Sequence, residues 1–263
     1  MSIYMTNQGK SVVAVIDTTA AGQRPNLGRN LTHGLLDALG RAIVMGQYDN
    51  GSFPTEAELA KQHGVSRSVT REAVKMLTAK GLVSARPRQG TIVEPRSSWN
   101  LFDTDVLRWL LNRKFSLDLL VQFNQLRIAI EPEAAALAAT LADESELAAI
   151  KAGLERMKAA ENGADHILEA DIAFHVAVLK GSKNPFFAQF QDVVGTALRS
   201  SIQFTNRIKG HSASIPDHAA VEQAIAKRQP DKARAAMKKI VSDVLELIDT
   251  NEREAKPART KRK

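Results

Sequence analysis

Apolar residues recur along this chain at intervals of three and four positions, the spacing that predicts amphipathic helices over most of its length. In the first third, the pattern predicts one helix that ends near Gly46, a short helix at 56–63 and a longer one at 66–79. Two short apolar runs, at 82–85 and 91–93, flank a basic turn and predict a strand hairpin. The predicted order is therefore helix, helix, turn, helix and hairpin.

The rest of the chain shows the helical period without a strand pattern. We expect a short helix at 104–111, after a linker that begins at Glu94. Pro132 falls inside the first of the longer helices, so we expect a kink or a break there. The pattern predicts an antiparallel bundle of roughly six or seven helices. The longer helices are expected at 117–141, 144–161, 165–181, 185–208, 214–228 and 231–251.

Basic residues are concentrated in the predicted helix-turn-helix segment. Between Lys61 and Arg88 there are seven Lys or Arg residues and a single acidic residue, Glu72. Between Ser98 and Asn251, in contrast, 18 basic and 20 acidic residues give a net charge of −2. A localised basic face is the electrostatic footprint of a protein that binds a polyanion. Together with the turn spacing, this charge favours double-stranded DNA as the partner over the alternative of a solvated charged helix face.

The helix at 66–79 is the candidate recognition helix, because its N-terminal residues would face base edges in a major groove. Arg67 and Arg71 are four residues apart and share one face, and Arg suits bidentate contact with guanine. For Arg71, the competing interpretation is an ion pair with an acid such as Glu72 or Glu58. The tip of the hairpin would reach the neighbouring minor groove. The predicted DNA-binding residues are Ser66, Arg67, Ser68, Thr70, Arg71, Arg88, Gln89, Gly90 and Thr91.

With 263 residues, the chain is long enough for two domains, each with its own core. We predict a mainly α protein with an N-terminal winged helix-turn-helix domain and a C-terminal all-α antiparallel helical bundle. The predicted parts are a flexible leader at 1–26, the winged domain at 27–95, a linker with a short helix at 96–115, the bundle at 116–251 and a basic tail at 252–263. The bundle is the expected site of ligand binding and dimerisation.

A second candidate site lies in the bundle, where Asp171 and His175 are four residues apart on one predicted helix. A carboxylate and an imidazole that aim at one point commonly hold a divalent ion, and His218 is a candidate third ligand. We therefore expect a divalent metal ion, with zinc as the expected metal. The competing interpretation is a buried ion pair or a surface pair without a metal.

Composition restricts the remaining chemistry. The chain has no cysteine, which excludes disulfides, cysteine-ligated zinc and thiol catalysis, and which suits a reducing cytoplasm. No apolar run approaches the ~20 residues that a bilayer span requires, so we expect no membrane partner. We expect a cytoplasmic protein.

The two clusters, in this order, resemble the GntR family of bacterial transcription regulators, in the FadR subgroup with the all-helical FCD ligand domain. The segment Trp99–Trp109 looks most like the galactonate-operon repressors of that subgroup. In the first domain, the resemblance rests on Phe53–Leu59, Val65–Ala73, Leu77, Gly81–Val83 and Gly90–Val93. In the second, it rests on Arg127, Glu131-Pro132, Asp171–His175, Asn184-Pro185 and Asp217-His218.

The resemblance implies a homodimeric repressor that binds a palindromic operator and is released by a small carboxylate, such as a sugar acid. It also implies that Asp171, His175 and His218 are metal ligands and that Arg127 faces the same cavity and pairs with the effector's carboxylate. Many members supply one more histidine from the last helix, and the corresponding position here is Ile240.

Two further residues, Asn184 and Arg199, are candidates for the effector pocket. For each of them, the alternative is a helix cap or a surface position. Two functions compete with a regulator. A metal-dependent hydrolase with a basic accessory domain would use the three metal ligands to activate water, although no Glu or His is obviously placed as the general base. A constitutive architectural DNA binder would carry the bundle without a ligand. We expect a regulator and not an enzyme.

Overall fold

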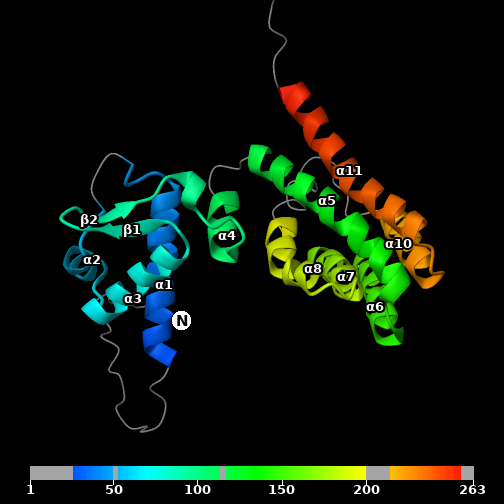
Figure 1. Cartoon of the computed structure of the whole chain (residues 1–263), viewed down its shortest axis with the longest axis horizontal. Coiled ribbons are helices and arrows are strands. Elements are labelled where there is room, and N and C mark those ends of the chain that lie inside the picture. The colour runs from blue at the N-terminus through cyan, green and yellow to red at the C-terminus, as the bar shows by residue number, and fades with distance from the viewer. Residues whose placement is uncertain (1–25, 50–52, 113–116, 200–213, 256–263) are drawn as a thin grey trace, which may run out of the picture.

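The computed structural model describes residues 26–49, 53–112, 117–199 and 214–255, so most of the predicted leader and tail lie outside the described residues. The described chain forms two units, with one short helix between them (Figure 1). The predicted mainly α architecture is confirmed. No helix within these ranges has the length and apolar character that a membrane crossing requires.

The first unit combines three helices with a two-stranded hairpin. The helices are α1 (Asn26–Val44), α2 (Glu56–His63) and α3 (Arg67–Ala79). The strands β1 (Val83–Arg86) and β2 (Gly90–Val93) pair antiparallel, in a register that runs from Val83 opposite Val93 to Arg86 opposite Gly90. This is the predicted winged helix-turn-helix.

Local caps define the helix-turn-helix. The Thr55 hydroxyl accepts from the amide of Glu58 at 3.3 Å, and the Glu58 carboxylate accepts from the amide of Thr55 at 2.8 Å, which is a reciprocal capping box. Gly64 ends α2 with φ at 64°, the left-handed conformation that glycine adopts without a Cβ penalty. Ser66 then caps α3 by accepting from the amide of Val69 at 3.3 Å. These caps set the sharp turn between the two helices.

The short helix α4 (Thr104–Asn112) packs on the first unit. The ring of Trp109 lies so close to Gly40 of α1 that a Cβ built at position 40 would meet the ring at 2.3 Å. Lys80, at the end of α3, donates to the Asp103 carboxylate at 2.7 Å and 2.9 Å. An ion pair therefore connects the segment predicted as a linker to the C-terminal end of α3.

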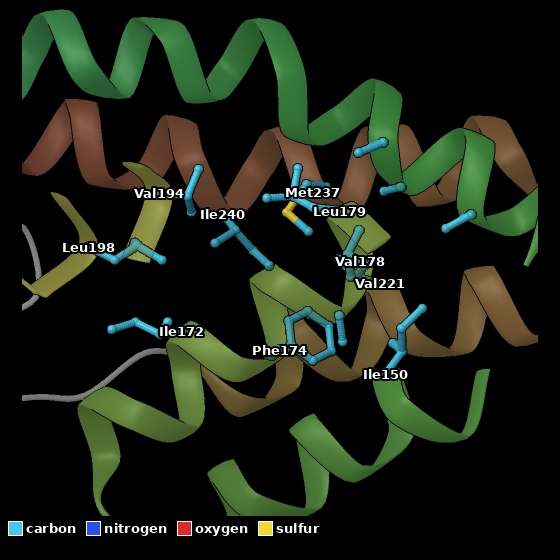
Figure 2. Close-up of a cluster of buried hydrophobic side chains, with 14 of the residues drawn as sticks. Ile150, Ile172, Phe174, Val178, Leu179, Val194, Leu198, Val221, Met237 and Ile240 are labelled. Carbon is cyan, nitrogen blue, oxygen red and sulfur yellow. The ribbon is translucent and has the colours of Figure 1, made fainter. Parts of the chain in front are cut away.

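The second unit is a bundle in which α5 and α11 run antiparallel along each other and α6 packs on α7 (Figure 1). Figure 2 shows its buried apolar cluster, in which Phe174 and Val178 from α7 meet Val221 from α10 and Met237 and Ile240 from α11. The helices of the unit are α5 (Leu117–Leu141), α6 (Glu144–Glu161), α7 (Ile167–Gly181), α8 (Pro185–Gln189), α10 (Ile215–Ala226) and α11 (Pro230–Ala255).

Two helices differ from the prediction. The helix predicted at 185–208 is interrupted, because α8 ends at Gln189 and a turn at Phe190 precedes a further helical stretch at 191–199. Residues 200–208 lie outside the described residues. In α5, the helix continues through Pro132 to Leu141, so of the two expected outcomes, a kink or a break, the break is absent. A single proline removes one backbone donor from a helix, and the long packed interface of α5 with α11 outweighs that loss.

Candidate functional site

The first candidate site is the exposed N-terminal end of α3. Ser66, Arg67, Ser68 and Arg71 are all exposed there, on the side of the unit that faces away from its core. The Nε atom of Arg71 lies 3.3 Å from Oε2 of Glu56 at the start of α2. The structure therefore pairs Arg71 with a different acid from the two that the sequence suggested.

Thr70 does not belong to this surface. Its side chain is fully buried, and its hydroxyl donates to the Ser66 carbonyl at 3.2 Å. The core face of α3 runs through Thr70, Ala73 and Leu77, with Val69 and Val74 partly buried against the same core. The structure therefore turns the Thr70 side chain into the core of the unit and away from the exposed surface where the other predicted DNA-binding residues of α3 lie.

The wing carries the other predicted DNA-binding residues. Arg88, Gln89 and Gly90 are exposed at the hairpin tip, while Thr91 is half-buried on β2. The amide of Gln89 donates to the Arg86 carbonyl at 3.2 Å, which closes a tight turn. Both Gly90 and Arg88 have positive φ, at 77° and 65°. A positive φ is ordinary for glycine but strained for arginine, so the tip holds an arginine in a backbone conformation that favours glycine.

We expect Arg88→Gly to separate stability from binding. Relief of the left-handed strain should leave the free energy of unfolding unchanged or raise it by at most about 1 kcal/mol, since glycine also loses more entropy on folding. DNA affinity should nevertheless fall, because a basic side chain is lost from the wing. Urea unfolding and fluorescence anisotropy with a labelled duplex measure the two effects. Unchanged DNA affinity would remove Arg88 from the interface.

The second candidate site is a buried cluster inside the bundle. His218 Nε2 lies 3.0 Å from Asp171 Oδ1, and His175 Nε2 lies 3.6 Å from the same oxygen. The two Nε2 atoms are 3.4 Å apart. All three side chains are at most 5% exposed. The helices α7 and α10 thus bring the three predicted ligands to one point.

The outer ring nitrogens of the two imidazoles face acceptors. His175 Nδ1 lies 2.7 Å from Glu131 Oε2, but the angle of this contact does not meet hydrogen-bond geometry. His218 Nδ1 lies 2.8 Å from the Ser214 carbonyl oxygen. Metal-bound histidines almost always direct their second ring nitrogen to a carboxylate or a carbonyl in this way. Both Nε2 atoms are therefore oriented toward Asp171.

The ligand atoms fit a divalent ion. Atoms bound to zinc at about 2.0–2.1 Å with tetrahedral angles are separated by roughly 3.3 Å, and the three separations here range from 3.0 to 3.6 Å. Asp171 Oδ1 is buried without a hydrogen-bond partner, despite its two nitrogen neighbours. An unpartnered buried oxygen is costly unless something else satisfies it. The donor set of one carboxylate and two imidazoles suits zinc and similar metals.

Arg127 borders this cluster and is itself buried. Its Nε donates to Glu131 at 2.6 Å, its Nη1 donates to the side-chain oxygen of Asn124 at 3.1 Å, and its Nη2 lies 3.5 Å from His175 Nε2. Burial alone would raise the pKa of Glu131, but the charges of Arg127 and His175 lower it to about 2. Burial also raises the pKa of Asp171, yet the neighbouring histidines and Arg127 hold it below its ordinary value. Both carboxyl groups are therefore ionised at neutral pH.

Two predicted effector residues lie outside this cluster. The Asn184 side chain caps α8 by accepting from the amide of Phe186 at 2.9 Å. Arg199 is half-exposed, forms an ion pair with Glu169 and borders a surface cleft of about 350 Å³ with Thr104 of α4. For both residues the structure shows the alternative that the sequence left open, a helix cap for Asn184 and a surface position for Arg199.

Sequence reasoning missed Glu131 as a site residue and Glu56 as the partner of Arg71. A signal for Glu131 existed, because it follows Arg127 by four residues, the same spacing that singled out Asp171 and His175. With its pKa near 2, the Glu131 carboxylate has too little proton affinity to be a good general base at neutral pH. The hydrolase alternative therefore gains no base from this cluster.

Comparison with known proteins gives matches to both units. Residues 31–93 match the family of bacterial regulatory proteins named gntR, and residues 122–243 match the FCD domain. The chain is 35% identical over 224 residues to the galactonate operon transcriptional repressor of Escherichia coli (strain K12), over 83% of this chain and 97% of that protein. It is 34% identical over 208 residues to the HTH-type transcriptional regulator YieP of the same strain, over 78% and 90%.

Among solved structures, the match to Lar, described as controlling expression of the Listeria monocytogenes agr system, has a TM-score of 0.54. It covers 87% of this chain and 99% of that chain, at 19% sequence identity. At this identity the likeness supports a shared fold and nothing more.

Proposed function

The chain belongs to the GntR family of bacterial transcription regulators and carries an FCD domain, and from this premise we propose that it represses a sugar-acid catabolic operon. In this proposal, a small carboxylate of the galactonate type binds in the bundle and releases the protein from operator DNA. The observation that carries the proposal is the buried cluster of Asp171, His175 and His218 beside Arg127 in the bundle. The other unit of the same chain presents the exposed basic N-terminal end of α3. The name of the galactonate repressor supports the effector class.

The DNA-binding part of the proposal uses a homodimer on a palindromic operator. Each protomer would insert the N-terminal end of α3 into a major groove, with Arg67 and Arg71 toward base edges and the wing toward the neighbouring minor groove. The exposure of both arginines supports this use. A two-fold symmetric pair of recognition helices would make the half-site spacing depend on the arrangement of the two protomers.

Arg67→Ala tests this DNA function. We expect it to cost about 1–3 kcal/mol of operator binding and to relax base preference, because a base-reading arginine is lost. Lys75→Ala is the matched control, since Lys75 is an exposed basic residue on the same helix, and it should weaken binding to all duplexes alike. Gel shifts on a duplex selected from a random pool and on its scrambled version measure both. Equal losses on the two duplexes for Arg67→Ala would contradict base reading.

The effector part follows from charge balance in the buried cluster. Histidines that bind a metal must be neutral, and in that state Arg127 brings one positive charge against the two carboxylates of Glu131 and Asp171, so one negative charge is uncompensated. Buried charges are costly unless they are paired, so the cluster favours a cation. A divalent ion held by the three ligands would reverse the balance to one excess positive charge. The loaded site would then favour a ligand with one carboxylate, for which the ion supplies a Lewis acid.

A physical route from this site to the recognition helix runs through α4. Val106 and Trp109 of α4 join the core of the first unit, whereas Leu107 and Leu111 join the core of the bundle. A ligand-driven change in the bundle would therefore move α4 and, with it, the first unit. To change operator occupancy from nearly full to nearly empty, the effector must distinguish the two arrangements by about 5 kcal/mol.

A further inference from the structure

The recognition surface contains an acidic residue whose position is unexpected for a DNA-binding face. Glu56 is the first residue of α2, and its carboxylate is 3.3 Å from Arg71 Nε. Its side chain is 37% exposed and that of Arg71 is 64% exposed, so a duplex that reaches one of them reaches the other. The pair joins the two helices of the helix-turn-helix at the surface that the exposed arginines define.

The contact with Glu56 restrains the guanidinium of Arg71 through Nε and does not use Nη1 or Nη2. An Arg side chain has several rotatable bonds and a planar fork of donors, and the donors on Nη1 and Nη2 can contact two acceptors of guanine. In this structure, the contact to Glu56 is made through Nε. The outer fork therefore remains available, and the carboxylate limits the directions in which it can point.

The carboxylate also has an electrostatic effect on DNA of every sequence. A negative side chain beside phosphate groups opposes the favourable release of counterions, and it weakens binding to any duplex. Where Arg71 contacts a guanine, the aligned contact offsets this cost. Where the base is wrong, the cost remains. Specificity is a difference between two affinities, so a residue that weakens the incorrect complex more than the correct one raises specificity.

We propose that Glu56 is a positioning residue that determines operator specificity by aligning Arg71 for guanine, while its charge weakens binding to duplexes of every sequence. The inference rests on the proposed DNA-binding function and assigns the origin of its selectivity. It predicts that removal of the charge together with the acceptor for Arg71 Nε strengthens binding to incorrect DNA while the discrimination between sequences falls.

Two substitutions separate alignment from charge. Glu56→Ala removes both the carboxylate charge and the acceptor for Arg71 Nε. Glu56→Gln removes the charge but keeps an amide oxygen that can accept from Nε. Glu72→Gln is the control for charge alone, because Glu72 is exposed on α3 and is 3.9 Å from Lys75, so the substitution leaves the Arg71 contact intact.

The experiment uses the full-length protein and two labelled duplexes: one selected by the wild type from a random pool, and its scrambled version. Fluorescence anisotropy at several salt concentrations gives the ratio of the two affinities. We expect Glu56→Ala to bind the scrambled duplex more tightly and to lose about tenfold in the ratio. Glu56→Gln and Glu72→Gln should strengthen binding to both duplexes and keep most of the ratio.

An unchanged ratio in Glu56→Ala would overturn the proposal, and so would an equal fall of the ratio in Glu72→Gln. Failure of the DNA-binding function itself has a different signature, since the wild type would then prefer no duplex from the pool. Thermal unfolding of the two Glu56 variants controls for the helix, because both lose the same favourable charge at the N-terminus of α2.

Discussion

Replacement of Glu131 with alanine should lower the free energy of unfolding by about 3–5 kcal/mol, because it leaves the guanidinium of Arg127 buried without its carboxylate. Arg127 and Glu131 are 2% and 1% exposed, and they are joined through Nε at 2.6 Å and through Nη2 at 3.2 Å. The lost carboxylate also faces His175 Nδ1 at 2.7 Å. Urea unfolding at neutral pH, in protein kept in chelator, measures the change.

The control is a double variant in which both charges are replaced by apolar groups, Arg127→Met with Glu131→Leu. A buried ion pair that is replaced as a unit is often neutral or stabilising, whereas a broken pair is not. The double variant should therefore be clearly more stable than Glu131→Ala alone. If the two variants were equally destabilised, the loss would come from cavity formation and not from an unpaired charge.

The pH dependence provides a second measurement of the same pair. Since the folded pKa of Glu131 is about 2 and its ordinary value is 4.5, the folded state binds fewer protons than the unfolded state between these values. The resulting stability is present above pH 4.5 and is lost as the pH falls toward 2. It corresponds to about 3 kcal/mol. The stability difference between wild type and Glu131→Gln should therefore shrink on acidification.

The fold was largely accessible from the sequence because its determinants are local. Thr55 and Ser66 are caps that can be read from residue type and spacing, and the apolar period of each helix predicts which side is buried. The turn at Phe190 was not accessible, since neither glycine nor proline marks it. The burial of Thr70 was not accessible either, because residue type favours Val69 for the core and only tertiary packing places the neighbouring threonine there as well.

The site was only partly accessible, for a related reason. Asp171 and His175 could be paired because they lie one helical turn apart, but the contact of His175 with Glu131 joins two helices that the sequence does not place side by side. The same holds for Glu56 and Arg71, which meet across the turn between α2 and α3. Spacing rules find partners on one helix, whereas partners on different helices are set by packing.

Substitution of Asp171 by asparagine should reduce zinc affinity by at least about 100-fold, which is the upper range for loss of a residue that only supports a ligand. The amide keeps the shape of the side chain but removes its charge, and with it the excess negative charge that favours a cation. Operator binding without effector should be unchanged, because the exposed end of α3 is on the other unit. Release of the operator by D-galactonate, or by other members of a sugar-acid panel, should be lost.

Calorimetric titration of chelator-treated protein with zinc measures the affinity, and unfolding with and without chelator gives an independent readout. For the wild type, zinc at a hundred times its dissociation constant would raise the free energy of unfolding by about 2.7 kcal/mol, and Asp171→Asn should show no such increase. Asp165→Asn is the matched control, since Asp165 lies just before α7 and pairs with Arg156 at the surface. Loss of operator affinity together with zinc affinity in Asp171→Asn would contradict a sensing role, because the cluster would then serve the fold of the bundle.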